Sequence, residues 1–485
     1  MPLRLYNTAV RKKEPFYPLR EGRIGIYVCG VTVYDLCHIG HARSAIVFDV
    51  LVRYLRARGF DVTYVRNFTD VDDKIIKRAN ETGKETAVLA QEYIDAFYED
   101  MGKLGVLNAD HEPRATEHIG GMIDMIKALL ERGHAYEAGG DVFFSVESFH
   151  GYGELSGRKL EDMQAGSRIA VNKKKRHPMD FTLWKSAKPG EPQWDSPWGP
   201  GRPGWHLECS VMSNHFLGPS FDIHGGGKDL LFPHHENERA QSIGANGGDF
   251  AKYWVHNGFV TVESEKMSKS LGNFLTIRDA LKSYHPEVIR LFLLSKHYRR
   301  PLDFTKSGIR ALQTGLVRIY RTLQKVEEVA GHPDPGVMDK GAFLSGDRHP
   351  PFLEQFISAM DDDLNTPAAI GLIFEKVREM NRALGEGEAD KDDSLRVHLR
   401  DARMQVSLAG RVLGILGESP EAFFGQIAEM EGRPDPQEIE KLIAVRAEAR
   451  ANRDWAKADE IRDRLKEMGV IVEDGPQGTT WRFDV

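Results

Sequence analysis

The sequence predicts an α/β chain in which a Rossmann-like parallel-sheet domain carries an inserted connective segment and is followed by an all-α helical bundle and a small C-terminal α+β module. Three observations support this prediction. A strand, a helix and a second strand follow one another within residues 24–66, a stretch rich in Trp, Pro and Gly interrupts the α/β pattern at about 134–204, and nearly everything after Arg300 has helical periodicity. A chain of 485 residues is also too long for a single hydrophobic core.

The first unit begins with a buried strand. The run from Ile24 to Cys29 is apolar, a helical pattern follows from Ala42 to Leu55, and a second strand is expected from Asp61 to Arg66. This order indicates a right-handed βαβ unit of a parallel sheet, whose ligand crevice lies at the C-terminal ends of its strands. The residues from His38 to His41 fall at that crevice.

The next part of the chain changes character twice. Helical periodicity runs over about 84–132, and the stretch over about 134–204 then turns irregular, which is more typical of a packed loop region than of a regular domain. The basic run at 173–176 is expected to be an exposed turn, with a phosphate-contacting patch as the minority interpretation. The sheet pattern resumes at 221–224 and at 253–262.

The remainder is helical apart from its end. Residues 331–351, rich in Gly, Pro and Asp, are predicted to be a mobile linker, and 418–437 a loop. Two further helices and a short β element at 470–473 and 480–483 then form a separate small module. Helices are expected at about 306–330, 352–360, 367–384 and 395–416.

These changes of pattern set the predicted domain boundaries. The sheet domain takes residues 1–120 and 201–260, on either side of an inserted segment at 121–200. A region at 261–305 contains a polar Lys/Ser loop. The helical bundle covers 306–417, and the C-terminal module covers 437–485.

Bulk properties exclude several classes of protein. The composition, with 41% hydrophobic and 28% charged residues, is that of a soluble protein, no apolar stretch is long enough to cross a bilayer, and the N-terminus lacks a secretory signal. We therefore expect a cytoplasmic protein without membrane contact. Three widely spread cysteines argue against a disulfide framework. The net charge of −7 gives no general sign of nucleic-acid binding, so any RNA contact must be local.

Four residues are candidate metal ligands. His234 and Glu238 are four apart and share one face of a helix that is expected to begin near Pro233, while Cys209 precedes them and Cys29 ends the first strand. Thiolate, imidazole and carboxylate are ordinary zinc ligands, and a weakly held carboxylate would permit a fifth, thiolate ligand to bind. The alternative is a closed structural site that only fastens the inserted segment to the sheet.

Two short motifs together indicate an ATP-activating enzyme. His38 and His41, separated by Ile39 and Gly40, would meet the phosphates of ATP at the positive end of a helix, where Gly40 leaves room for the nucleotide. Lys266 and Lys269 would stabilise the charge that develops on departing pyrophosphate. Taken singly, the histidines could only cap a helix and the lysines could belong to a solvated turn. Mg²⁺ is expected to accompany ATP, although no carboxylate cage for it stands out.

Further candidates line the expected crevice. The segment Asn67-Phe68-Thr69-Asp70 follows the second strand and could line the pocket, with Thr69 offering a hydroxyl. His224 and Asp229 lie at the two ends of the run His224-Gly225-Gly226-Gly227-Lys228-Asp229, where glycines would let a ligand approach the backbone. Asp229 could hold a ribose or an amino group, and either segment could also be a simple tight turn.

At these residues the chain resembles the class I aminoacyl-tRNA synthetases, and among them the cysteinyl-tRNA synthetase family. The motifs at 38–41 and 266–270 match the class letter for letter, and Cys29, Cys209, His234 and Glu238 match the family's zinc ligands in order and spacing. The resemblance extends through 201–206, 362–367 and 453–459. It covers nearly the whole chain, with 331–351 and 418–437 as the parts that do not align.

The resemblance implies a ligase that forms cysteinyl-adenylate and pyrophosphate from L-cysteine and ATP, then transfers cysteine to the 3′-terminal adenosine of its cognate tRNA. It implies one Zn²⁺ per chain that binds the substrate thiolate, an RNA-spanning helical bundle, an anticodon-binding tail near Trp455 and Trp481, and a monomeric enzyme. Zinc prefers thiolate to hydroxyl, so no proofreading domain is needed to exclude serine. The implied substrate contacts are Thr69, Trp205, His224 and Asp229.

Two alternatives stay open at this point. A ligase of the same catalytic ancestry would join cysteine to an amino sugar without RNA, but the intact stretch at 437–485 favours the synthetase. The other alternative is a zinc-containing RNA-binding protein without catalysis. The presence of both ATP motifs in the right order speaks against it.

Overall fold

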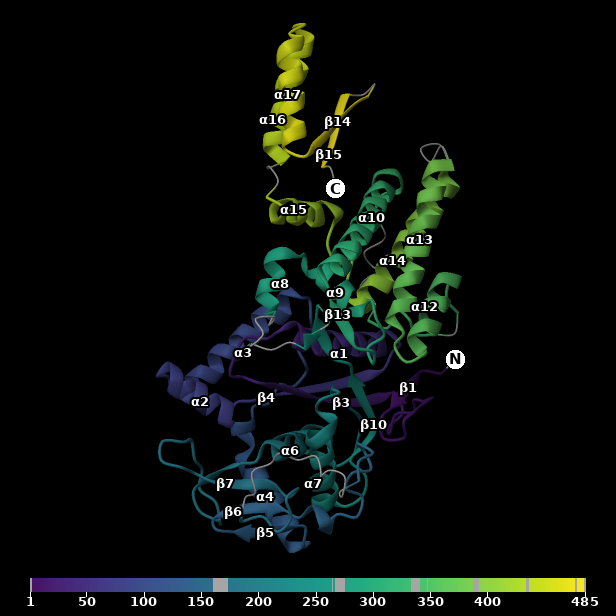
Figure 1. The fold of residues 1–485 in the computed structure, drawn as a ribbon. Helices are drawn as coiled ribbons and strands as arrows, with labels where there is room; N and C mark the ends of the chain where they lie inside the picture. The colour runs from purple at the N-terminus through teal and green to yellow at the C-terminus, as the bar shows by residue number, and fades with distance from the viewer. Residues whose placement is uncertain are drawn as a thin grey trace.

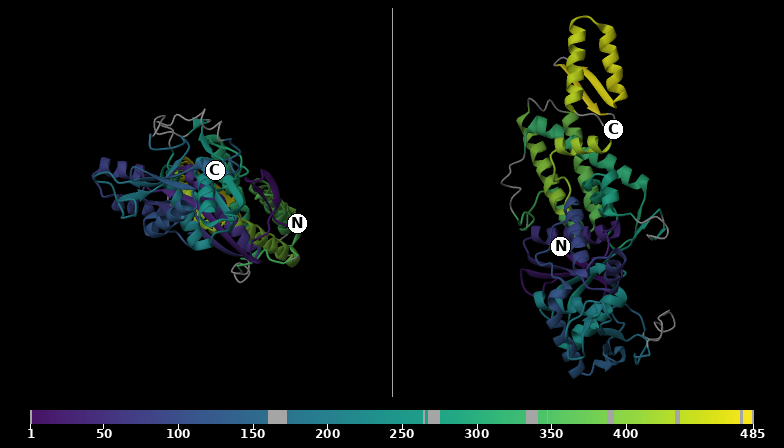
Figure 2. Two further views of the ribbon diagram at one scale, coloured as in Figure 1. Left: turned by 90° about the horizontal axis from the view of Figure 1, so that it is seen from below. Right: turned by 90° about the vertical axis from the view of Figure 1, so that its left-hand side faces the viewer.

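The computed structural model describes residues 2–159, 173–263, 265–266, 275–332, 341–346, 348–386, 392–432, 436–475 and 478–483. The molecule is elongated, with the parallel-sheet domain near its middle (Figure 1). The segment inserted into that domain forms one end, and helices lead from the sheet domain to the C-terminal module at the other end, as Figure 2 also shows. The predicted fold class is confirmed.

A parallel four-stranded sheet forms the centre of the sheet domain. Its strands are β3 (Arg23–Thr32), β4 (Asp61–Thr69), β9 (Phe221–Gly227) and β10 (Ala251–Asn257), in the order β10-β9-β3-β4. Apolar runs build these strands because both faces of the sheet are covered by helices. The chain order reverses between β3 and β9, and the crevice of a parallel sheet opens at such a switch point, beyond the C-terminal strand ends.

Helix α1 (Ile39–Ala57) connects β3 to β4, as predicted, and is buried along most of its length. It packs between the sheet and two later helices, α9 (Pro286–Leu294) and α14 (Asp393–Leu413). Phe48 of α1 lies so close to Gly225 that a Cβ on this glycine would come within 2.3 Å of the ring. Gly225, which lies within β9, therefore makes room for the packing of α1 rather than for a ligand.

The helical stretch expected over 84–132 is broken. Helices α2 (Asp73–Thr82) and α3 (Thr86–Lys103) follow β4, and α4 (Ile119–Glu131) begins only after an extended connection. Gly105 turns the chain at a φ of 67°, and the connection then runs beside β4, where His111 bridges to Val65. Tertiary pairing with the strand thus overrides local helical preference here.

The inserted segment contains a regular antiparallel sheet, so the expectation of a packed loop region was wrong. Its strands β5 (Ala135–Ala138), β6 (Asp141–Phe144), β7 (Phe181–Ser186) and β8 (Gly201–Pro203) pair in that order. Strands this short show little periodicity, and β8 contains a proline that only an edge strand tolerates. Trp184 of β7 is fully buried in the core of this sheet. The basic run at 173–176 lies in a largely exposed turn, as predicted.

Two helices cover the face of the sheet opposite α1. Helix α6 (Trp205–Leu217) follows β8, and α7 (Glu236–Asn246) lies between β9 and β10 (Figure 1). A π-helical turn, Leu231–His235, precedes α7, so the regular helix starts at Glu236 rather than near Pro233.

The strand expected over 253–262 is two strands in different sheets. β10 ends at Asn257, and β11 (Val260–Val262) pairs with β12 (Glu265–Lys266) and β13 (Leu302–Phe304). The chain bends between them at Gly258, where a Cβ would come within 2.6 Å of the carbonyl oxygen of Arg300. Helix α8 (Ile277–Ser283) and then α9 follow this hairpin.

The helical bundle consists of α10 (Lys306–Ala330), α12 (Pro351–Asp361), α13 (Thr366–Glu386) and α14. A further helix, α15 (Pro420–Met430), lies in the region 418–437. The prediction of a loop there was therefore wrong. Ser419 caps this helix, Pro420 opens it, and the ring of Phe423 stacks on Tyr320 of α10 with a centroid distance of 3.9 Å.

The predicted mobile linker is fixed where the structure describes it. The side chain of Leu344 is fully buried, and its backbone N–H donates to the carbonyl oxygen of Ala57 over 2.8 Å. Residues 333–340 and 347 lie outside the described part of the chain.

Separate hairpins close the two ends of the chain. The N-terminal hairpin, β1 (Arg4–Asn7) and β2 (Lys12–Pro15), packs beside β10. The C-terminal module contains α16 (Pro436–Ala451), α17 (Trp455–Glu467), β14 (Val470–Gly475) and β15 (Gly478–Phe483). Among the described residues, no helix is long and apolar enough to cross a membrane. The module has its own core of Ile439, Ile443, Ile461, Leu465 and Val470.

Candidate active site and metal cluster

The four candidate metal ligands come together from four different elements. Cys29 lies in the C-terminal half of β3, Cys209 on α6, His234 in the π-helical turn and Glu238 on α7, and one ligand atom of each lies within 4.8 Å of all the others. The two Sγ atoms are 3.6 Å apart, and Cys29 Sγ lies 3.3 Å from Glu238 Oε1. His234 Nε2 lies 2.8 Å from the same oxygen.

This cluster fits a small tetrahedral cation by donor type and by spacing. Two sulfurs bound to zinc at about 2.3 Å each would be separated by about 3.8 Å at a tetrahedral angle, close to the sulfur–sulfur distance found here. Glu238 is fully buried and Cys209 almost so. An overlapping set, in which His224 and His235 join Cys29 and Glu238, also has its ligand atoms within 4.8 Å of one another. The two sets share one thiol and one carboxylate.

Buried charges in the cluster stabilise one another. Burial raises the pKa of Glu238, but the neighbouring His234 and His224 outweigh burial and hold this pKa well below its usual range. Burial lowers the pKa of His234, but the charge of Glu238 raises it to about 10. Burial raises the pKa of Cys29 well above its ordinary value. Burial also acts to raise the pKa of Cys209, but the hydrogen bond from Cys29 and the hydrogen bond and charge of His234 together outweigh it and bring this pKa to about 6. The pocket therefore favours a thiolate on α6.

His206 and Trp205 fix the orientation of His234. The two imidazoles face each other through their Nδ1 atoms at 2.8 Å, and burial lowers the pKa of His206 well below its usual range, so the neutral ring of His206 can accept from His234 Nδ1–H. This contact turns Nε2 of His234 toward the cluster. The indole of Trp205 stacks on His234 with a centroid distance of 4.3 Å and keeps 38% of its surface exposed, so it covers the cluster on the solvent side.

His224 and Thr69 lie next to the cluster but face inward. His224 Nε2 lies 2.8 Å from Glu238 Oε2, and its fully buried ring stacks on Trp254. The hydroxyl of Thr69 donates to Glu208 over 2.8 Å. Burial raises the pKa of Glu208 well above its usual range.

Three contributors to the site received no role of their own in the sequence analysis: Asn67, which was named only within a segment that could line the pocket, His206 and Glu208. Asn67 accepts from the backbone N–H of Gly30 over 2.9 Å, and its side-chain oxygen lies 3.7 Å from Cys209 Sγ. A Cβ on Gly30 would come within 1.6 Å of the Asn67 carbonyl, so β3 and β4 can approach here only with glycine. All three lie close in sequence to residues that the sequence analysis did propose for the site. Their contact partners lie on other helices and strands, so these contacts produce no local sequence pattern.

The paired histidines cap helix α1. His38 is the N-cap residue: its Nδ1 accepts from the backbone N–H of Gly40 over 3.0 Å, while its own backbone N–H donates to His41 Nδ1 over 3.2 Å. The two rings stack with a centroid distance of 3.8 Å. Because both Nδ1 atoms accept, each neutral ring carries its proton on Nε2.

Both capping histidines are neutral near pH 7. Burial lowers the pKa of His38 to about 4, although the charge of Asp229 opposes this effect. Burial also lowers the pKa of His41 to about 3, and the charges of His38 and Lys74 add to it. Asp229 itself is exposed in the turn after β9. The arrangement offers an anion two N–H donors and the positive end of a helix, but no full cationic charge.

The described residues on both sides of the predicted lysine loop are hydrogen-bonded, and those after the loop lie beside these histidines. Before it, Lys266 pairs through its backbone with Thr261 in the β11–β12 hairpin. After it, the carbonyl of Leu275 accepts from the N–H of Ile39, and the N–H of Ile277 donates to Cys37. The side chain of Lys266 and the whole of Lys269 lie outside the described residues.

Comparison with known proteins places this geometry in a family. The profile of the tRNA synthetases class I (C) catalytic domain matches residues 15–314, that of the DALR domain matches 355–417, and that of the cysteinyl-tRNA ligase anticodon binding domain matches 435–482. The cysteine–tRNA ligase of Geobacter metallireducens is 55% identical over 485 residues, which cover 99% of this chain and 100% of the relative. That of Pelobacter propionicus is 52% identical, with all of both chains covered. Neither of the two alternatives from the sequence is favoured by these relatives.

Solved structures support the fold independently. The methionyl-tRNA synthetase of Mycobacterium tuberculosis in complex with methionyl-adenylate has a TM-score of 0.61 at 17% identity, with 83% of this chain and 93% of that chain covered. At this low identity the likeness concerns the fold alone.

Proposed function

This chain belongs to the cysteine–tRNA ligase family of class I aminoacyl-tRNA synthetases, and from that premise we propose how its residues divide the reaction. The enzyme uses ATP with Mg²⁺ to activate L-cysteine and transfers the cysteine to tRNA. The observation that carries the residue assignment is the buried cluster of two thiols, an imidazole and a carboxylate at the same sheet edge as the paired histidines.

Cys29, Cys209, His234 and Glu238 would hold one zinc ion per chain. When bound, this ion supplies a Lewis-acid centre that prefers thiolate to hydroxyl and so selects cysteine over serine. The protein's own contribution is orientation: His206 fixes the imidazole ligand through its Nδ1 atom, and other neighbours hold the carboxylate. The donor types and the sulfur–sulfur distance support zinc as the occupant.

His38 and His41 would bind the phosphates of ATP through Nε2–H. Neutral donors at a helix N-terminus stabilise anionic oxygens, and Gly40 between the histidines leaves room for the nucleotide. Lys266 and Lys269 would meet the charge on departing pyrophosphate. Support for the lysines is indirect, and consists of the backbone attachments on both sides of their loop.

Four residues would contact or position the amino acid and its adenylate. Trp205 covers the cluster with an exposed indole, and Asp229 lies exposed within electrostatic range of His38. Thr69 and His224 would act through neighbours, because their polar atoms bond to Glu208 and Glu238. The first pair is therefore suited to direct contact and the second pair to positioning.

The tRNA would extend along the molecule from the sheet domain to the C-terminal module. In this proposal residues 1–120 and 201–260 carry the chemistry, 121–200 form the connective insertion, 261–305 contact the acceptor stem, 306–417 span the RNA, and 437–485 bind the anticodon. The anticodon-binding profile at 435–482 supports the last assignment. Trp455, which is 59% exposed, is better suited to stack a base than Trp481, whose indole N–H donates to Glu440.

We place the enzyme in the cytoplasm as a monomer. Its three cysteines are free and buried, which fits a reducing compartment in which translation takes place. Residues of one chain supply every ligand of the cluster, so the site needs no second subunit.

Replacement of single cysteines tests the assignment. Cys209→Ser should lower the zinc content and the rate of cysteine-dependent pyrophosphate exchange together. Cys37→Ser is the matched control, because Cys37 is also buried but belongs to the apolar core outside the cluster. Zinc per folded chain and exchange with cysteine or serine are measured side by side. Full cysteine activation by metal-free Cys209→Ser would disprove the assignment.

A further inference from the structure

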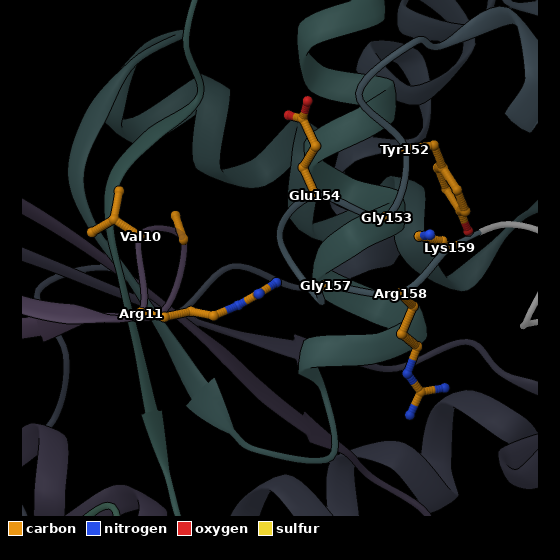
Figure 3. A pocket seen from close by; sticks show the side chains of 9 residues that line it. Val10, Arg11, Tyr152, Gly153, Glu154, Gly157, Arg158 and Lys159 are labelled. Atoms are coloured by element: carbon orange, nitrogen blue, oxygen red, sulfur yellow. The ribbon is translucent and has the colours of Figure 1, made fainter.

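An open cavity of about 690 Å³ lies between the turn that joins β1 to β2 and the loop of the inserted segment at 151–159 (Figure 3). Its volume is within the range of about 300–1,000 Å³ that is usual for ligand pockets. Arg11 comes from the turn, and Tyr152, Glu154, Arg158 and Lys159 come from the loop. Nothing in the reaction described above uses these residues.

The lining of the cavity is positively charged. Its cations are Arg11, Arg158 and Lys159, and its one carboxylate, Glu154, is paired with Arg239 over 2.9 Å. Within the described ranges, none of the three cations forms an ion pair with a carboxylate. Among the described residues, the lining of the cavity therefore has a net positive charge, in contrast to the chain as a whole, whose net charge is −7.

Local structure shapes the positions of two of these exposed cations. Arg11 adopts a φ of 54°, and Figure 3 shows its side chain extending toward Gly157. A Cβ on Gly157 would come within 1.8 Å of Arg11 Nη2, so this glycine makes room for the guanidinium. The guanidinium of Arg158 lies 4.5 Å from the ring centroid of Phe232, a cation–π contact. Because a guanidinium group is planar and pre-organised, it loses less entropy for each hydrogen bond that it forms with an anion.

An aromatic ring completes the lining. The hydroxyl of Tyr152 donates to Asn237 over 2.5 Å, which anchors the ring at one edge and leaves it half-buried at the cavity wall. Cationic side chains combined with an anchored aromatic ring are the usual means of binding single-stranded nucleic acid, in which phosphates meet the charges and a base stacks on the ring.

The cavity borders the edge of the sheet at which the reaction takes place. Thr8, in the turn, contacts His256 near the C-terminal end of β10 over 2.8 Å. On the other side, the backbone N–H of Ser156 donates to Glu236 over 2.7 Å, two residues before the ligand Glu238. A polymer whose end reaches the cluster from this side must pass the cavity.

We propose that this cavity binds the phosphodiester backbone of the unpaired 3′ end of tRNA, with Arg11, Arg158 and Lys159 on phosphates and Tyr152 under a base. The proposal rests on the function proposed above and adds to it a specific RNA contact outside the helical bundle and the anticodon module. It commits to RNA because the site combines clustered cations with an anchored aromatic ring on the path to the adenylate.

The test is a triple variant, Arg11→Gln, Arg158→Gln and Lys159→Gln, which removes charge while largely keeping side-chain length. The matched control is Arg132→Gln, Lys127→Gln and Lys188→Gln, three exposed cations of the same inserted segment that do not line the cavity. Cysteine-dependent pyrophosphate exchange and charging of cognate tRNA transcript are measured at 50 and 200 mM salt. Each lost phosphate contact reduces the slope of log affinity for tRNA against log salt concentration by about 0.7. With three contacts removed, the loss of tRNA affinity between 50 and 200 mM salt should therefore be about 20-fold smaller than in the unmodified enzyme.

The proposal predicts a raised KM for tRNA and a shallower salt dependence in the cavity variant alone, with unchanged exchange. Unchanged charging would overturn it, and so would equal effects in the control variant, which would indicate general electrostatics. A loss of pyrophosphate exchange together with tRNA charging would overturn the proposal as well. The cations would then only stabilise the structure around the proposed metal ligands His234 and Glu238. Absence of cysteine-dependent exchange in the unmodified enzyme would instead refute the proposed function itself.

Discussion

A fully buried ion pair joins helix α1 to α9, and its removal yields a quantitative prediction. Arg290 of α9 pairs with Asp49 of α1, and neither is exposed to solvent. The same guanidinium donates to the carbonyl of Leu413 at the end of α14 over 2.6 Å and to Leu104 after α3 over 3.2 Å. A Cβ on Gly414 would come within 2.3 Å of Arg290 Cζ, so the contact requires glycine there.

The cost of Arg290→Met follows from the partners it leaves behind. Breaking a buried ion pair by removal of one partner typically costs about 3–5 kcal/mol. Asp49 keeps two other contacts, to Arg53 over 2.8 Å and to the N–H of Leu107 over 3.0 Å, so its charge is not left alone. We therefore expect the lower end of that range, about 3 kcal/mol, which raises the population of the opened junction on the order of 100-fold.

Arg53→Met is the control, because Arg53 pairs with the same carboxylate from a position whose side chain is 18% exposed. It should cost less than about 1 kcal/mol. Urea unfolding followed by tryptophan fluorescence compares the two variants, and charging of tRNA is measured beside cysteine activation. Since Arg290 connects α1 to the bundle, charging should fall more than activation. A free-energy loss in Arg290→Met no larger than in Arg53→Met would refute the reasoning.

Four other predictions concern the site and the C-terminal module. His38→Asn keeps an acceptor for the helix N-terminus but lacks Nε2–H, so cysteine activation should fall by about 10²–10³ with little loss of stability, whereas a loss of helix stability alone would show that His38 is only a cap. Burial lowers the pKa of His38 from 6.5 to about 4, so the unfolded chain takes up a proton at higher pH than the folded chain does. The free energy of unfolding should therefore fall as the pH drops from about 6.5 to 4. His38→Asn should weaken this pH dependence, which urea titrations at several pH values measure. Lys269→Ala should lower the turnover of pyrophosphate exchange much more than the affinity for ATP, and a loss confined to ATP affinity would contradict its proposed role. Truncation after Pro436 should spare pyrophosphate exchange but impair charging of tRNA, and an unchanged charging rate would contradict the proposed role of the C-terminal module.

Sequence patterns predicted the parts of the fold whose signals are local and long. The apolar run that begins at Ile24 and the helix that follows His38 gave the βαβ unit, because both are buried along their length. The inserted sheet escaped prediction because its strands are short and their partners are distant: β6 and β7 pair although more than thirty-five residues separate Phe144 from Phe181. Helix α15 was missed because it is stabilised by contact with α10, through Phe423 and Tyr320, which the sequence does not reveal.

The candidate site shows the same division. Residue type and position together selected the two cysteines, the histidine and the glutamate of the cluster: His234 and Glu238 are four apart, Cys29 ends a strand, and the set matches a family pattern in order and spacing. The residues that orient them were not predictable in this way. His206 acts on His234 from another helix, and Asn67 reaches Cys209 from a neighbouring strand. Such supporting contacts depend on how helices pack on the sheet.

The loop of the inserted segment at 151–159 bears directly on the candidate metal cluster. It holds Glu236 and Asn237, the two residues before the candidate ligand Glu238: Ser156 donates its N–H to the buried carboxylate of Glu236, and Tyr152 donates its hydroxyl to Asn237. Burying the carboxylate of Glu236 is costly unless its partners are fixed, and an irregular, mobile loop would not fix them. The loop at 151–159 therefore helps to hold the first turn of α7 in position, and with it the carboxylate of Glu238 that His224 and His234 share.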